Sequence, residues 1–269
     1  MDKIRIFAEK KSQTHIIMII GTLLGLTIMP VFLLMLFIYF QDKYQKEPIK
    51  TLVKAFFGGM LAIAFTLVLD FFIGLTFGRV PILSDTVFYD AFLSAGIPEE
   101  LCKFLIFMIF IWRDKNFDEY FDGIVYACFI GLGFACLENI MYVFDATIVS
   151  LAGGFVTSFF RALLSVPGHF LFGVILGYFL SMAKFRPEKK GKYIWTGLLL
   201  AMLAHGLFDW LLMVTDRLGT GLTILVYGLF ILGDIGLWFC AIGLIRRQQE
   251  NSRLQQAEIE SVNTDNEFN

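Results

Sequence analysis

The sequence predicts an all-α membrane protein, a polytopic helical bundle with about seven transmembrane helices. Of its 269 residues, 57% are hydrophobic and 17% are charged, and the mean hydropathy is +0.71. Soluble domains carry about 25% charged residues. Apolar runs that reach the length of a membrane span, about 20 residues, recur along most of the chain. These observations exclude an ordinary soluble domain.

Six runs are long enough to cross a bilayer by themselves: 16–40, 52–77, 121–144, 167–185, 193–213 and 221–245. The run 97–112 is shorter, and it reaches the needed length only if the helical-looking residues 86–96 precede it. We count it as the seventh span. Residues 147–165 fit a tilted span, a re-entrant helix or an interfacial helix, so eight spans are the alternative.

The chain divides into one membrane domain and two polar ends. Residues 1–15 form a charged N-terminal segment, and the run that follows is too long for a signal-peptide core and lacks a small-residue cleavage site. We expect it to be retained as the first span. Residues 16–245 form the membrane domain. Residues 246–269 are rich in Gln, Glu and Asn and are expected to be a frayed helix that becomes a disordered cytoplasmic tail.

Basic residues predict the orientation, because Lys and Arg gather in cytoplasmic loops. The link 184–192, "KFRPEKKGK", is strongly basic, and arginines follow the last span, so both are placed in the cytoplasm. Alternation puts 41–54 and 113–120 on the same side. It puts the links 78–90, 145–160 and 214–220 outside. The basic N-terminus also falls outside by this count, which conflicts with the rule.

Composition also limits the partners and cofactors. The formal net charge is −2, and no basic stretch with interleaved aromatic residues is present, so we expect no nucleic-acid partner. The four cysteines lie inside apolar runs and form no CxxC pair, which indicates buried small hydrophobic residues rather than disulfides. Glycines four apart, Gly21/Gly25 and Gly173/Gly177, suit close helix packing.

The stretch "SAGIPEELCKFLIF" places charges at the head of an apolar run. Pro98 fits the first turn of a helix, and Glu99 and Glu100 then lie near the positive end of its dipole. Lys103 follows at helical spacing and can pair with either glutamate. The alternative to a functional site is an interfacial cap with a salt bridge.

Four further places put ionisable groups inside predicted spans. Glu138, followed by Asn139, lies deep in its span with no basic residue within a helical turn, so its partner must come from another helix; a protonated structural glutamate is the alternative. Arg161 and His169 flank Pro167, and His205 and Asp209 share a helical face, where the carboxylate could orient the imidazole. Structural packing is the alternative for a single histidine. Asp70 fits an interior hydrogen-bond partner.

These groups share a depth in the predicted topology. Glu99 and Glu100 lie at the outer end of their helix, and Glu138, His169 and His205 lie in the outer halves of theirs. With a rise of about 1.5 Å per residue, all fall in one outer-leaflet layer. A single polar site explains a shared depth, whereas scattered structural charges do not need one.

The ordered motifs resemble the PrsW family of bacterial intramembrane proteases, which is related to the CAAX prenyl-protease superfamily. "EELCK" matches EExxK, "FACLE" matches FxxxE and is followed by Asn139, and "HGLFD" matches HxxxD, with Arg161 and His169 between them. "FDGIVYACFIGLGFACLENIMY" and "QDKYQKEP" are also similar to that family. The resemblance covers about residues 30–245.

The resemblance implies peptide-bond hydrolysis at or near the outer face of a bacterial cell membrane, with a single-span membrane protein as substrate. Some members cut membrane-anchored anti-sigma factors to start an envelope-stress response. The implied catalytic residues are Glu99, Glu100, Lys103, Glu138, Asn139, Arg161, His169, His205 and Asp209.

Two chemistries fit these residues. In one, Glu99 or Glu100 activates water directly, and this route is slightly favoured. In the other, His169, His205 and Glu138 bind a metal, with zinc as the candidate, and Asp209 orients a ligand. HExxH is absent, so both stay open.

Two functions from other classes compete with a protease. A proton-coupled transporter or channel also uses carboxylates and histidines inside the membrane, but the inner halves of the spans hold few ionisable groups. A membrane scaffold without catalytic activity does not explain the shared depth.

Overall fold

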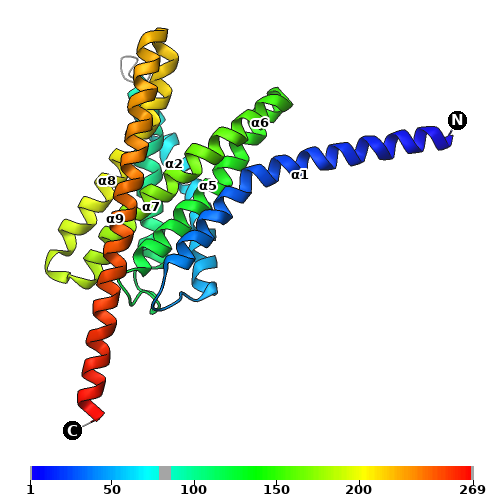
Figure 1. The fold of residues 1–269 in the computed structure, drawn as a ribbon. Helices are drawn as coiled ribbons and strands as arrows, with labels where there is room; N and C mark the ends of the chain where they lie inside the picture. The colour runs from blue at the N-terminus through cyan, green and yellow to red at the C-terminus, as the bar shows by residue number, and fades with distance from the viewer. Residues whose placement is uncertain (1, 79–85, 268–269) are drawn as a thin grey trace.

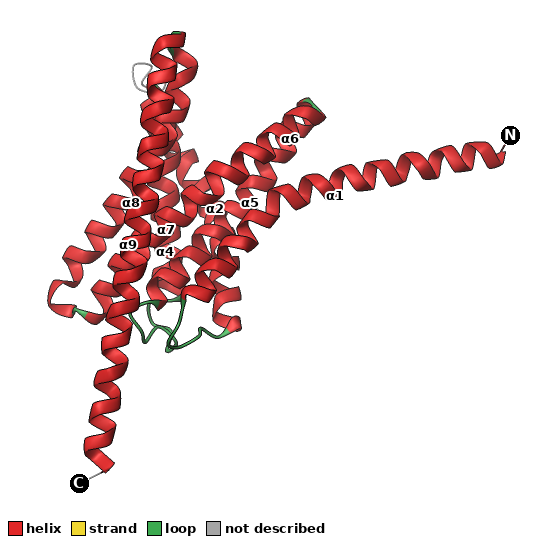
Figure 2. Ribbon diagram, viewed as in Figure 1, coloured by secondary structure: helices red, strands yellow, loops and turns green. Residues whose placement is uncertain are grey.

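The computed structural model describes residues 2–78 and 86–267, and within them it is a bundle of helices without a β-strand (Figures 1 and 2). The residues 79–85 of the predicted outer link lie outside the described part. The elements are α1 Asp2–Gln41, α2 Ile49–Phe77, the π-helix η1 Tyr89–Gly96, α4 Ile97–Phe110, α5 Asp122–Val149, α6 Leu151–Phe160, the π-helix η2 Arg161–Ser165, α7 Val166–Phe185, η3 Pro187–Lys189, α8 Lys190–Met213, η4 Val214–Arg217 and α9 Thr220–Glu267.

Helices α5 and α7 form the centre of the bundle. Residues 122–136 of α5 and most of α7 are buried, while α1, α2, α8 and α9 expose large apolar side chains, as expected of helices that face lipid. Gly173 and Gly177 let the two central backbones approach: a Cβ on Gly177 would lie 2.3 Å from the carbonyl oxygen of Gly123. The predicted close packing at this pair is confirmed, whereas Gly21 and Gly25 have no neighbour within 4 Å.

A second glycine pair sets the crossing of α2 and α5. A Cβ on Gly59 would lie 2.0 Å from the carbonyl oxygen of Ile130, and a Cβ on Gly133 would lie 2.0 Å from that of Phe56. Only glycine allows helix backbones to come this close. The crossing fixes α2 against the turn of α5 that precedes Glu138.

Six described helical stretches are long and apolar enough to span a membrane, which confirms a polytopic helical membrane protein. Residues 151–165 do not add a separate span: α6, η2 and α7 are continuous, and together they form the stretch Leu151–Phe185. The chain reverses at Ser150, whose side chain caps α6 by accepting a hydrogen bond from the Gly153 N–H at 2.9 Å.

The predicted seventh span corresponds to η1 followed by α4, so residues 86–96 are helical and extend this run as expected. It is not among the six stretches that are long and apolar enough to span a membrane, so the seventh span stays a prediction. Pro98 lies in the first turn of α4, as expected, but α4 continues directly from the π-helix η1 rather than from a loop. Proline lacks the N–H that an α-helix needs. The π-helical turn accommodates this loss, and the Ile97 N–H reaches the carbonyl of Phe92.

The links 42–48, 111–121 and 186–189 lie at one end of the bundle, and the C-terminal part of α9 extends beyond the same end (Figures 1 and 2). The turns at Ser150 and 218–219 lie at the other end. This arrangement agrees with the alternation that the sequence predicts. Which end faces the cytoplasm remains a prediction.

The polar end of the chain, expected as a frayed helix that becomes disordered, is described as the C-terminal part of α9, which is helical to Glu267. Gln248 and Ser252 are fully buried. The Ser252 hydroxyl accepts a hydrogen bond from the Phe121 N–H at 3.0 Å, and the Gln255 amide donates to the carbonyl of Asp118 at 2.7 Å. Polar residues one or two turns apart thus attach this helix to the 111–121 link, a pattern that composition alone does not reveal.

Candidate active site

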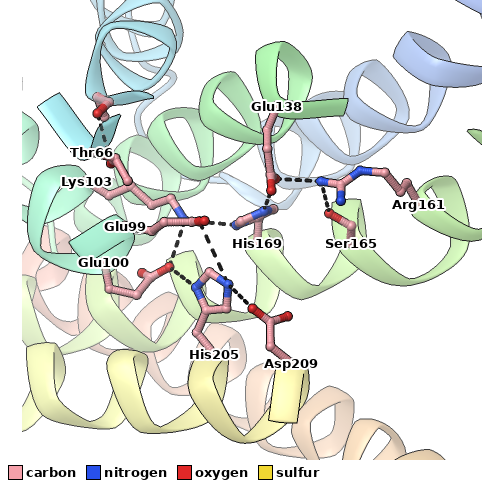
Figure 3. Close-up of polar contacts among 11 residues, drawn as sticks. Thr66, Glu99, Glu100, Lys103, Glu138, Arg161, Ser165, His169, His205 and Asp209 are labelled. Atoms are coloured by element: carbon pink, nitrogen blue, oxygen red, sulfur yellow. Dashed lines mark hydrogen bonds and ion pairs between the residues drawn. The ribbon is translucent and has the colours of Figure 1, made fainter. Parts of the chain in front are cut away.

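The predicted site residues meet in one connected cluster, and Figure 3 labels all of them except Asn139. They come from five elements of the bundle: α4 supplies Glu99, Glu100 and Lys103; α5 supplies Glu138 and Asn139; η2 supplies Arg161; α7 supplies His169; and α8 supplies His205 and Asp209. Hydrogen bonds or ion pairs join each of them to at least one other member.

Lys103 lies at the centre of the cluster. Its Nζ lies 2.8 Å from Oε1 of Glu100, 3.2 Å from Oε2 of Glu99 and 2.9 Å from Nδ1 of His169. The ammonium also lies 4.0 Å from the centre of the Phe134 ring, a cation–π contact. This contact gives the phenylalanine of the FxxxE motif a physical role, since it covers a buried charge.

Glu138 joins the histidine to an arginine. Its Oε2 lies 2.8 Å from Nε2 of His169 and 2.7 Å from a terminal nitrogen of Arg161. Arg161 also donates to Oδ1 of Asn139 at 2.6 Å and to the Ser165 hydroxyl at 2.9 Å. The partner of Glu138 therefore does come from another helix, as its position in the sequence requires.

His205 is held between carboxylates. Its Nδ1 lies 2.9 Å from Oε1 of Glu100, and its Nε2 lies 3.3 Å from Oδ2 of Asp209 and 3.8 Å from Oε2 of Glu99. The Phe172 ring stacks on the imidazole with the ring centres 4.7 Å apart. The expected i, i+4 contact between His205 and Asp209 is present. Asp70, outside the cluster, accepts a hydrogen bond from Ser94 at 2.5 Å, as expected of an interior partner.

Two cavities adjoin this cluster. The first, about 250 Å³, is lined by Glu99, Glu138, His169, His205 and Asp209, with Arg161 at its wall. The second, about 470 Å³, lies between α2 and α5 and reaches Glu99 and Glu138 from the other side. Glu100 and Lys103 line neither of them, and only a space of about 10 Å³ adjoins these two residues. Glu99 and Glu138 are therefore accessible to a substrate, whereas Glu100 is enclosed.

The side chains fit a metal ion. One ligand atom each from Glu99, His169 and His205 lies within 4.8 Å of the others, and all three residues are buried. Two histidines and one carboxylate, with a further position left open, are a donor set of catalytic zinc sites. Glu99 takes the place that the sequence prediction gave to Glu138, whose carboxylate is bound to Arg161. Glu100 contacts Nδ1 of His205 and would orient the ring so that Nε2, which faces Glu99 and Asp209, is the ligating nitrogen.

The structure adds residues that the motifs do not single out. Tyr142 stacks on the Arg161 guanidinium at 4.1 Å, and Ser165 accepts a hydrogen bond from the same group. Tyr142 lies one helical turn after Glu138, on the same face of α5. Its spacing in the sequence could therefore have identified it as a neighbour of Glu138. Ser165 lies in the π-helical turn η2, where α-helical spacing does not apply.

Residues 47–233 match the sequence model described as "PrsW family intramembrane metalloprotease". The chain is 35% identical over 234 residues to a protein named Protease PrsW from Geobacillus kaustophilus, which covers 87% of this chain and 95% of the relative. It is 34% identical over 186 residues to Protease PrsW from Bacillus subtilis, which covers 69% of this chain and 80% of the relative.

A third relative, Protease PrsW from Oceanobacillus iheyensis, is 32% identical over 231 residues, which cover 86% of this chain and 98% of the relative. No solved structure matches the chain. The matched region contains every candidate site residue.

Proposed function

The chain belongs to the PrsW family of intramembrane metalloproteases, and from this premise we propose that the Glu99–His169–His205 cluster hydrolyses a peptide bond of a single-span membrane protein. The chain is a peptidase and a multi-pass membrane protein of bacterial type. The observation that carries the proposal is the convergence of these three buried ligands on a cavity of about 250 Å³.

Glu99, His169 and His205 would hold the metal ion, for which zinc is the candidate. When bound, such an ion polarises a carbonyl and lowers the pKa of a coordinated water. The description of the family as metalloproteases and the donor set together favour this route over a route that uses glutamate alone.

The surrounding residues fix the two imidazoles. Glu100 is only 1% exposed and binds both Lys103 and Nδ1 of His205, so it acts as a positioning residue rather than as a base that reaches substrate. With Glu100 accepting the Nδ1 proton of His205, the lone pair of Nε2 points toward Glu99 and Asp209.

Glu138 is the proposed general base. Its contacts with His169 and Arg161 use Oε2, and Oε1 would accept the proton of an attacking water in the cavity that Glu138 lines. Arg161 lines the same cavity and would stabilise negative charge that develops on the scissile carbonyl oxygen.

The cut is proposed to fall near the outer face of the membrane. The basic 184–192 link supports a cytoplasmic placement of the end that carries it, and both cavities border the helix halves that point toward the opposite end. The family resemblance supports a membrane-anchored anti-sigma factor as the substrate, and thus a part in envelope-stress signalling.

A proton-coupled transporter is the alternative function. It needs a polar route to both faces. On the side of Glu100 and Lys103, the space that these residues line is about 10 Å³, and most of its other lining residues are apolar. Protease relatives over most of the chain favour proteolysis.

Cleavage of a single-span reporter in proteoliposomes tests the proposal. The wild-type protein should cut the reporter, and Glu99→Gln should not, while Glu258→Gln on the exposed C-terminal part of α9 should cut normally. A wild-type rate in Glu99→Gln would contradict the site assignment. Sidedness is tested in intact cells with Lys189→Cys and Gly219→Cys: labelling by an impermeant reagent at 219 only is expected, and labelling at 189 only would reverse the orientation.

A further inference from the structure

The groove between α2 and α5 is acidic and leads to the catalytic cluster. The cavity of about 470 Å³ in this groove is lined by Asp70 of α2, Asp90 of η1 and Asp145 of α5, together with Glu99 and Glu138. No lysine, arginine or histidine is among its described lining residues. An acidic cavity beside a peptidase site favours a positively charged substrate side chain.

The packing of α2 against α5 explains why the groove lies at this place. The two backbones touch at Gly59 and Gly133, so the helices are closest there. The cavity begins just beyond this crossing, at Ile63 and Phe134, and continues toward Asp70 and Asp145. Figure 1 shows α5 and α6 leaning away from α8 and α9 toward the end that carries Ser150.

The groove is open toward the surrounding lipid. Leu67 and Met141 line it and are 55% and 40% exposed. A membrane-spanning substrate helix can therefore approach Glu99 and Glu138 laterally from the lipid, without passing through the loops at either end. An unwound segment of such a helix would be required at the site, since helical hydrogen bonds hide the scissile carbonyl.

The charges in the groove are available for a partner. Asp90 and Asp145 are exposed, and neither carboxylate forms an ion pair or a side-chain hydrogen bond within the part of the chain that the structure describes. Glu99 and Glu138, in contrast, are bound to Lys103, His169 and Arg161. The unneutralised charge therefore lies on the outer part of the groove, away from the catalytic cluster.

We propose that this groove is a specificity subsite that takes a substrate segment with a lysine or arginine on the outer side of the scissile bond. Asp145 follows Glu138 by seven residues on α5, which is about 10 Å along a helix. An extended chain covers that distance in about three residues. The basic residue is accordingly placed about three positions outward from the cut. This inference rests on the proposed protease function, whose substrate class it specifies.

The test uses single-span reporters that differ only in the residue about three positions outside the cut: Lys, Ala or Glu. Wild-type protein in proteoliposomes should cut the Lys reporter with a kcat/KM about tenfold above that for the Glu reporter. Asp90→Asn combined with Asp145→Asn should bring the two rates within about twofold, and Asp145→Lys should favour the Glu reporter.

Two controls make the outcomes distinct. Asp216→Asn changes an exposed aspartate at the same end of the bundle that does not line the groove, and it should keep the wild-type preference. The Ala reporter shows that each variant is folded and active. Equal rates for all three reporters in the wild type would overturn the inference and leave the protease function intact. If the wild type cuts no reporter, the proposed function itself fails.

Discussion

Nζ of Lys103 lies 2.9 Å from Nδ1 of His169. An ammonium carries donors only, so Nδ1 must be the acceptor, and the proton of His169 then resides on Nε2, from which it is donated to Glu138. The lysine contacts Glu99 as well. Its positive charge thus occupies part of the space between two of the candidate metal ligands, and a bound metal ion would compete with it.

Lys103→Met is expected to destabilise the metal-free protein by about 3–5 kcal/mol, because it leaves buried carboxylates without their cation. Zinc should restore more stability to this variant than to the wild type, since the ion replaces the missing charge. Thermal unfolding in detergent, with and without zinc, measures both effects. Lys189→Met, at an exposed position, is the control. A Tm equal to the wild-type value without metal would refute the prediction.

Glu100→Gln and His205→Ala should not be additive in activity. Oε1 of Glu100 lies 2.9 Å from Nδ1 of His205, so both changes disturb the same imidazole. Residues that act as a unit lose about as much activity singly as together. The measurement is kcat/KM of the reporter for both single variants and the double variant. Losses that multiply would indicate that the two residues serve separate roles.

Gly133→Ala is expected to destabilise the bundle by about 1–3 kcal/mol or more, because the new Cβ would lie 2.0 Å from the backbone oxygen of Phe56. Gly228→Ala on α9 is the matched control, since nothing lies within 4 Å of a Cβ there. The difference in Tm between the two variants measures the effect. Similar Tm values would mean that α2 and α5 do not cross at this glycine.

Asp42→Asn should stabilise the protein near neutral pH. Burial, assisted by the Glu119 carboxylate, raises the pKa of Asp42 from 3.8 to about 6. A carboxyl group whose pKa is raised on folding contributes stability below its unfolded pKa and loses it as the pH rises through the folded pKa. Above pH 6 the wild type therefore carries a cost of roughly 1–3 kcal/mol, which the amide lacks.

The measurement for Asp42 is Tm against pH for both proteins. The advantage of Asp42→Asn should be largest near pH 7 and should shrink as the pH falls from 6 toward 3.8. An advantage that does not change over this range would show that Asp42 does not titrate in the folded protein as its burial requires.

The sequence predicts the composition of the cluster better than its geometry. Motif spacing within one helix, such as Glu99 with Lys103 or His205 with Asp209, reports which side chains share a face, and these contacts are present. Contacts between helices depend on packing angles that spacing does not encode. For this reason Glu138 was expected among the metal ligands, whereas Glu99 lies with the two histidines.

Irregular backbone accounts for the other differences. The π-helical turns η1 and η2 end just before Ile97–Pro98 and Val166–Pro167, and they let the helices continue through both prolines. The position of Pro98 in the first turn of α4 follows from the sequence, but the π-helical turn that joins it to the preceding helix does not. Polar composition likewise suggested a disordered tail, because it does not show that Gln248 and Ser252 meet partners on the core.

The central claim is that Glu99, His169 and His205 hold the metal of the peptidase site, and the zinc content of the purified protein tests it most directly. Elemental analysis should find about one zinc ion per folded wild-type chain. His169→Ala and His205→Ala should each retain almost none, and Glu138→Gln should retain most of it. Wild-type zinc content in both histidine variants, or a zinc-free wild type that cuts the reporter at full rate, would contradict the account.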